Sequence, residues 1–189
     1  MFRSFFVRPA AALLLAALLP VAALSQQLLP AQSEISFVSR QMGVPVEGRF
    51  KSFSAQLAFD PAQLATSKLV LSVDTGSADI SREVNAELPK PTWLNAAAFP
   101  KASFSSSSIK RLNATTFEVA GQLSIKGLSS DVVVPVSLVQ NGAQTVATGA
   151  FPIKRLVFRI GDKEWADTSM VADEVQVKFR LVLTGMAKL

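Results

Sequence analysis

The sequence predicts an all-β protein, an eight-stranded antiparallel up-and-down barrel with one short helix after the third strand. The first observation behind this prediction is that apolar and polar residues alternate over long segments, which is typical of strands with one buried face. The second is that turn sequences such as Asn141-Gly142 separate these segments. The third is that several segments are too long for a small sandwich. Closing such strands into a barrel leaves no exposed edge.

The first half of the chain predicts three strands, Ser33–Ser39, Val46–Asp60 and Ser67–Asp74. In the second of these, the apolar positions change from even to odd near Lys51–Ser52. A strand cannot change parity without an extra residue, so we expect a β-bulge there. Such a bulge bends a long strand, which suits a closed sheet.

One segment, within Ser77–Leu94, has a helical rather than an alternating period. Ile80, Val84 and Leu88 are four residues apart and form one apolar stripe of a short helix. Polar residues before the stripe are suitable N-caps, and the two prolines after it stop the helix. We expect this helix to cover one end of the barrel.

The second half of the chain predicts five more strands in antiparallel succession. Pro135 cannot donate a ladder hydrogen bond, which predicts a local defect or bulge in its strand. The run of four serines that starts at Ser105 is interpreted as a strand surface of small residues rather than a catalytic serine. The five strands are Ala102–Ser108, Thr115–Gly127, Asp131–Val139, Thr145–Ile160 and Asp173–Thr184.

The first 25 residues have the layout of a secretory signal peptide. Arg3 and Arg8 precede the unbroken apolar run Ala10–Leu19, which Pro20 then interrupts. A membrane anchor needs about 20 apolar residues, twice the length of this run. We therefore expect residues 1–25 to be removed and residues 26–189 to form a single β-barrel domain in the periplasm.

The composition excludes most kinds of catalytic site. The sequence contains no Cys, His or Tyr, so it has no Ser-His-Asp or Cys-His nucleophile and no usual zinc, haem or copper site. Residues 26–189 carry 17 basic and 14 acidic side chains, a net charge of +3 without a dense basic cluster. Nucleic acid is therefore not expected as a partner.

A carboxylate enzyme is the sharpest catalytic alternative. Asp162, Glu164, Asp167 and Asp173 lie close together in sequence and are candidates for acid and base, or for oxygen ligands of calcium. The segment lacks the spacing of an ion-binding loop, and surface loops are commonly acidic. We therefore predict no catalytic residue, no metal and no enzymatic activity.

Five pieces of the sequence together resemble the YceI-like proteins, a bacterial, mostly periplasmic family described as polyisoprenoid-binding. The resemblance covers nearly the whole chain after the leader. It implies a lipocalin-like eight-stranded barrel whose elongated apolar cavity takes an isoprenoid lipid, such as a polyprenyl lipid or a quinone, with no other cofactor. The pieces are Gly48-Arg-Phe50, Trp93–Pro100 (WLNAAAFP) with Ala102-Ser-Phe104, Gly121–Gly127 (GQLSIKG) with Val134-Pro-Val136, Gly149-Ala-Phe151 with Arg155, Phe158 and Gly161, and Asp173-Glu-Val175.

On this reading the apolar faces of the strands become the wall of the cavity. Arg155 is a candidate to meet a polar headgroup, with a surface salt bridge as its alternative. The wall candidates are Phe37, Phe50, Leu71, Val73, Phe104, Phe117, Val119, Leu123, Phe151, Phe158, Val177, Phe179 and Leu181. The candidates for the lid or mouth are Ile80, Val84, Trp93, Phe99 and Arg155.

The alternative reading is that the same apolar faces pack into a filled core, because an eight-stranded barrel can be solid or hold one ligand. The protein would then be an interaction module that docks onto a membrane partner. A transient membrane contact and a homodimer are left open as further partners.

Overall fold

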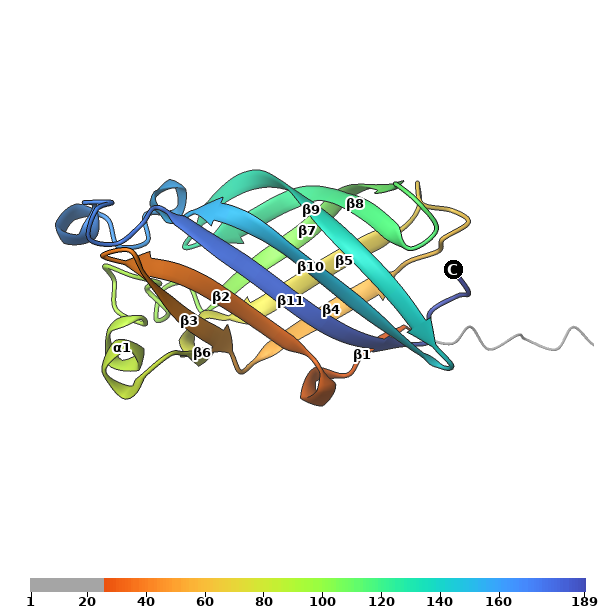
Figure 1. The fold of residues 1–189 in the computed structure, drawn as a ribbon, viewed down its shortest axis with the longest axis horizontal. Coiled ribbons are helices and arrows are strands. Elements are labelled where there is room, and N and C mark those ends of the chain that lie inside the picture. The colour runs from red at the N-terminus through yellow and green to blue at the C-terminus, as the bar shows by residue number, and fades with distance from the viewer. Residues whose placement is uncertain (1–25) are drawn as a thin grey trace, which may run out of the picture.

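One antiparallel sheet of eleven strands curls into a barrel (Figure 1). The computed structural model describes residues 26–189, so the predicted signal peptide lies outside the described residues. The strands are β1 (Gln27–Leu28), β2 (Glu34–Gln41), β3 (Val44–Phe50), β4 (Phe53–Ala58), β5 (Lys68–Asp74), β6 (Ala78–Asp79), β7 (Lys101–Arg111), β8 (Thr116–Ile125), β9 (Leu128–Asn141), β10 (Gln144–Lys154) and β11 (Glu174–Thr184). Their order in the sheet is β4-β5-β7-β8-β9-β10-β11-β2-β3-β6, and β1 pairs with β11.

The predicted all-β antiparallel class is confirmed, with more strands than expected. The predicted strand Val46–Asp60 forms two strands, β3 and β4. The strand is interrupted at Lys51–Ser52, where we expected a bulge. β3 pairs with β2 and β6, whereas β4 pairs with β5. The two-residue strands β1 and β6, which alternation cannot reveal, account for the rest of the difference.

The barrel is closed by a bent ribbon of two antiparallel segments, residues 44–58 and 68–79, which we call the closing ribbon. One half of it is β3 with β6, and the other half is β4 with β5. At the bend, the amide of Lys51 donates to the carbonyl of Ser77 at 3.1 Å. The amide of Asp74 donates to the carbonyl of Ser52 at 2.9 Å. The two ends of the sheet are therefore the two halves of one ribbon.

A second link joins the sheet ends near the chain termini. The side chain of Gln26 donates to the carbonyl of Phe59 at 2.6 Å and accepts from the amide of the same residue at 2.8 Å. This pair of bonds ties the start of β1 to the segment after β4. The closing ribbon and Gln26 together join the two ends of the sheet.

The helix predicted after the third long strand is α1 (Arg82–Glu87), shorter than the segment in which it was sought. The hydroxyl of Ser81 caps it by accepting from the amide of Val84, and Leu88 is its C-cap before Pro89. α1 lies at the same end of the barrel as the β2–β3 turn and the loop after β10 (Figure 1). We call this the helix end; the C-terminus lies at the opposite end.

Two predictions for the second half of the chain were wrong in part. The strand Thr145–Ile160 ends at Lys154, and the parity change beyond it marks the 3-10 helix η3 (Arg155–Phe158). The ladder between β8 and β9 runs unbroken past Pro135. The pairing of β9 with β10 stops next to this proline, at Val136, so the defect affects only one side of the strand. The other 3-10 helices are η1 (Pro30–Gln32), η2 (Thr75–Ser77) and η4 (Lys163–Trp165).

Three strand glycines make room for aromatic rings inside the barrel. At each one, a Cβ atom would collide with the ring of a phenylalanine on the neighbouring strand. The rings therefore occupy the space that a side chain at each glycine would fill. The pairs are Gly48 with Phe37, Gly121 with Phe104 and Gly149 with Phe179.

We predict that Gly149→Ala destabilises the barrel by about 1–3 kcal/mol, as overpacking does elsewhere. The new methyl group would meet the ring of Phe179 and the carbonyl oxygen of Pro135, and that oxygen belongs to the backbone of the adjacent strand. Urea unfolding measures the loss. The matched control is Ala150→Ser on the exposed face of β10, with an expected change within about 0.5 kcal/mol. Equal stability of Gly149→Ala and the parent would contradict this packing role.

Candidate functional site

The barrel encloses a cavity of about 520 Å³. Its lining extends from Val84 and Trp93 at the helix end to Leu183 and Met186 near the C-terminus. Almost all of the lining residues are apolar. This volume lies within the range of about 300–1,000 Å³ that is typical of small-molecule sites.

Most of the predicted wall residues line this cavity. They come from both halves of the closing ribbon and from five other strands, β2, β7, β8, β10 and β11. They are Phe37, Phe50, Leu71, Val73, Phe104, Phe117, Val119, Leu123, Phe151, Val177, Phe179 and Leu181.

Phe158 is the exception among the wall candidates, because it does not line the cavity. The prediction assumed that the strand continued beyond Lys154, whereas Phe158 lies on η3. Its side chain is 1% exposed and packs in a cluster that includes Leu94 and Phe151. Phe158 therefore closes the core at the helix end.

Four of the five lid or mouth candidates, Ile80, Val84, Trp93 and Arg155, line the cavity, and Phe99 does not. The ring of Phe99 lies instead against Gly127, in the turn between β8 and β9. Its carbonyl accepts a hydrogen bond from the hydroxyl of the buried Thr75 at 2.7 Å. Phe99 therefore holds the start of strand β7 in place and is not part of the mouth.

Several lining residues were missed by sequence reasoning. Leu69 and Leu183 share the parity of wall candidates on their own strands. Val134, Val136 and Leu138 alternate along β9, which supplied no candidate, so alternation could have identified all five. Trp165 gave no such signal because it lies in a polar loop. Its ring is 5.7 Å from that of Trp93, and both indoles line the cavity.

We infer that the cavity has its mouth at the helix end, along β3. Within the described sheet, residues 44–48 of β3 pair only with β2. Gln41 from the tip of β2 and Glu83 and Glu87 from α1 line the cavity here. Polar side chains therefore gather at this mouth. The rest of the wall is mainly apolar, with Lys68 at the start of β5 as a charged exception.

Arg155 organises the loops around the mouth. Its side chain is 2% exposed and donates five hydrogen bonds of 2.6–3.0 Å to main-chain carbonyls. Burial lowers the pKa of its guanidinium, and the nearby Asp173 carboxylate opposes this shift. All five N–H groups are used, so neither the headgroup contact nor the surface salt bridge fits this residue. The acceptors are the carbonyls of Ile160, Gly161, Trp165, Val171 and Ala172.

Gly161 lets two loops approach each other at this end. Its φ is +63°, a left-handed conformation that favours glycine, and a Cβ there would lie 2.8 Å from the ring of Trp93. Its amide donates to the carbonyl of Thr92 at 2.8 Å. The loop after β10 is thus joined to the loop after α1.

The acidic residues of this loop serve local structure. The carboxylate of Asp167 accepts from the amide and hydroxyl of Ser169, which lowers its pKa, whereas a general acid would need a raised one. Asp162 pairs with Arg159 at 3.3 Å, and Asp173 accepts from the amide of Leu156 at 3.0 Å. Within residues 26–189, no group of three or more His, Cys, Asp or Glu side chains is placed to hold a metal ion.

We predict that Arg155→Met destabilises the barrel by about 2–4 kcal/mol, because five carbonyls lose a buried donor. Arg155→Lys should recover less than half of this loss, since an ammonium has three donors and no planar fork. Thermal unfolding measures both variants, and hydrogen exchange of residues 159–172 should rise. Arg159→Met, a change of an exposed arginine in the same loop, is the control. Parent-like protection of this loop in Arg155→Met would contradict the role.

Comparison with known proteins identifies relatives over most of the described chain. Residues 27–183 match the YceI-like domain family. A UPF0312 protein of Azotobacter vinelandii is 30% identical over 96 residues, which is 50% of each chain. A UPF0312 protein of Vibrio cholerae is 27% identical over 114 residues, 59% of this chain and 60% of the relative. The chain thus spans between half and three fifths of the length of these curated relatives.

Solved structures share the barrel. Burkholderia cenocepacia BcnA is 45% identical with a TM-score of 0.79, covering 82% of this chain and 98% of BcnA. A domain from Saccharophagus degradans, described as polyisoprenoid-binding and implicated in plant cell wall breakdown, is 15% identical with a TM-score of 0.69. That alignment covers 85% of this chain and 98% of the domain, and at this identity it shows the fold alone. The predicted lipocalin-like fold is confirmed.

Proposed function

The chain belongs to the YceI-like domain family, and on that premise we propose that it binds a long-chain isoprenoid lipid in its barrel and carries or sequesters it. The observation that carries the proposal is the apolar cavity, which runs from the mouth at the helix end towards the C-terminal end. A prenyl chain is long, flexible and without polar groups. It matches a wall that offers hydrophobic contact and almost no hydrogen bonds.

Hydrophobic burial would supply the affinity. Each methylene transferred out of water contributes about 0.8 kcal/mol, so a chain of tens of carbons exceeds the cost of ordering it. The aromatic rings of Phe37, Phe104 and Phe179 line the chain's path. Selectivity then comes from length and shape, and a quinone or a polyprenyl lipid satisfies the same wall.

The polar mouth gives the proposed ligand a direction. Gln41, Glu83 and Glu87 line the cavity at the helix end, whereas Lys68 is a charged lining residue towards the opposite end. With several polar side chains at the mouth, a polar headgroup would remain there. The chain would extend towards Phe117 and Met186. Arg155 would not bind the headgroup, because its donors already hold main-chain carbonyls.

We assign the protein no reaction of its own, and we place it in the periplasm after removal of residues 1–25. The runner-up function, an interaction module with a filled barrel, is disfavoured by the cavity of about 520 Å³. In the part of the chain that the structure describes, no helix is long and apolar enough to cross a bilayer.

Native mass spectrometry of purified residues 26–189 tests the proposal. We expect a population of heavier protein that releases a prenyl lipid on activation. A single unliganded mass, both after purification and after incubation with a detergent-solubilised polyprenyl lipid, would contradict lipid binding.

Filling the cavity should remove the ligand. Leu123 is 9% exposed and lines the cavity, so Leu123→Trp is expected to lower lipid occupancy at least about tenfold by occupying the chain's volume. Val119→Trp, on the same face of β8, should act alike. The control is Gln122→Trp, whose side chain lies on the exposed face of the strand. Unchanged occupancy in both inward variants would mean that these residues do not face the ligand.

A further inference from the structure

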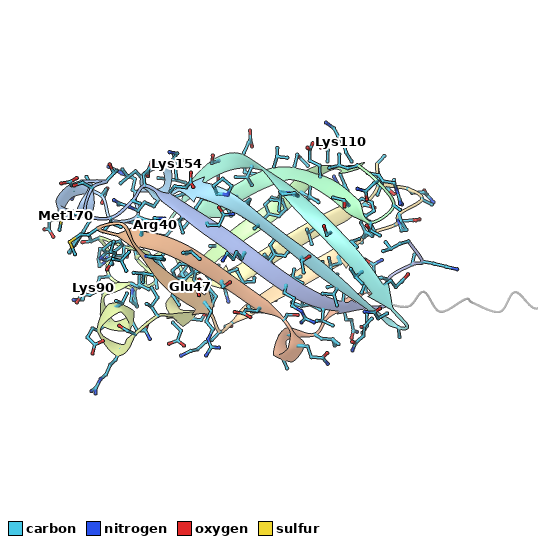
Figure 2. All side chains as sticks on the ribbon, viewed as in Figure 1. Arg40, Glu47, Lys90, Lys110, Lys154 and Met170 are labelled. Atoms are coloured by element: carbon cyan, nitrogen blue, oxygen red, sulfur yellow. The ribbon has the colours of Figure 1, made fainter. Side chains whose placement is uncertain are left out.

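We propose that the helix end docks onto the surface of a lipid bilayer, so that the cavity mouth opens against the membrane. The docking patch consists of Met42, Val44, Trp165 and Met170. The inference rests on the proposed function, because it names the surface through which the lipid would enter and leave. Figure 2 shows Met170 and Arg40, the latter beside the tip of β2, at the same end of the molecule.

The patch residues are exposed although they are large and apolar. The exposed fractions are 71% for Met42, 63% for Val44, 44% for Met170 and 41% for Trp165. They come from two segments, the β2–β3 turn and the loop around η4. The amide of Met42 donates to the carbonyl of Met170 at 2.9 Å, and Gln41 forms a β-bridge with Val171. The two segments therefore lie side by side, and they carry the four exposed apolar side chains.

This patch is held in shape before any contact is made. The guanidinium of Arg155 donates to the carbonyls of Trp165 and Val171 at 2.6 and 2.7 Å. The buried arginine thus holds the backbone behind the exposed apolar side chains. It stabilises the loop conformation in which these side chains face solvent. Burial of such a preformed surface loses little conformational entropy.

The patch continues into the cavity. Trp165 is shared between them, because its ring lines the cavity and is also partly exposed. Gln41 and Val171, which join the two segments, also line the cavity. A lipid that leaves the mouth would therefore pass directly beside the patch.

A bilayer fits this surface better than a soluble partner. Tryptophan is enriched at membrane interfaces because its apolar ring carries one polar N–H group. An isoprenoid chain also resides in bilayers, and a mouth that touches the membrane spares the chain exposure to water. The charged residues that flank the patch residues in the sequence have both signs, Arg40 and Lys163 against Glu164 and Asp167. The attraction is therefore apolar and needs no anionic lipid.

The test compares two triple variants of residues 26–189, the segment that contains every strand and the cavity. The patch variant combines Met42→Glu, Val44→Glu and Met170→Glu. It changes three residues of the patch, none of which lines the cavity. The control, Leu112→Glu with Val133→Glu and Val139→Glu, adds the same charge at apolar sites of similar exposure, 58%, 55% and 55%. Partition onto phosphatidylcholine vesicles is measured by cosedimentation, and lipid occupancy is measured separately with a prenyl lipid in detergent.

We expect the parent and the control to bind vesicles weakly, as a single lipid anchor does, and the patch variant to lose at least about tenfold in partition. All three should keep the same occupancy in detergent. Equal partition of the two variants, or no partition by the parent, would overturn the docking surface. So would a parent dimer that only the patch variant abolishes in sedimentation velocity, because a second copy would then cover the patch. Absence of lipid from the detergent assay would instead contradict the proposed function.

Discussion

The closing ribbon is the constraint on which the rest of the structure depends. Its two halves are the two ends of the sheet, so the bend at Lys51–Ser52 turns an open sheet into a barrel. The bend is reinforced by Asp79, whose carboxylate lies 3.0 Å from the ammonium of Lys51 and accepts from the side-chain amide of Asn85 at 2.8 Å. Because the sheet closes around its own apolar face, the barrel encloses a cavity, and Phe50 and its neighbours line it.

A second, local network determines what the helix end can do. Arg155 donates its hydrogen bonds to main-chain carbonyls and thereby holds the loop that carries Trp165 in place. Gly161 allows that loop to approach Trp93, so two indoles meet beside the mouth. The hydrogen bonds of Arg155 at this end therefore stabilise the loops, and the exposed apolar side chains are available to contact a ligand or a membrane. This division supports a binding function without assigning a catalytic group.

Alternation along the strands predicted most of the fold and most of the cavity wall, because each inward position follows from parity once the strand is recognised. The prediction failed where parity stopped being informative. Phe158 follows a strand that ends four residues earlier, and no local signal distinguishes that ending from a bulge. Trp165 reaches the cavity through a loop whose position depends on a distant arginine. A bulge at Lys51–Ser52 was expected, but the division into two strands and its role in closure depend on which strands pair.

The most direct test of the central claim is a crystal structure of residues 26–189 purified with a bound prenyl lipid. The account predicts continuous chain density along the barrel interior, in contact with Phe37, Leu123 and Phe179, and a headgroup near Gln41 and Glu83 at the helix end. Lipid density on the outer surface of the barrel, with side chains collapsed into the interior, would contradict it.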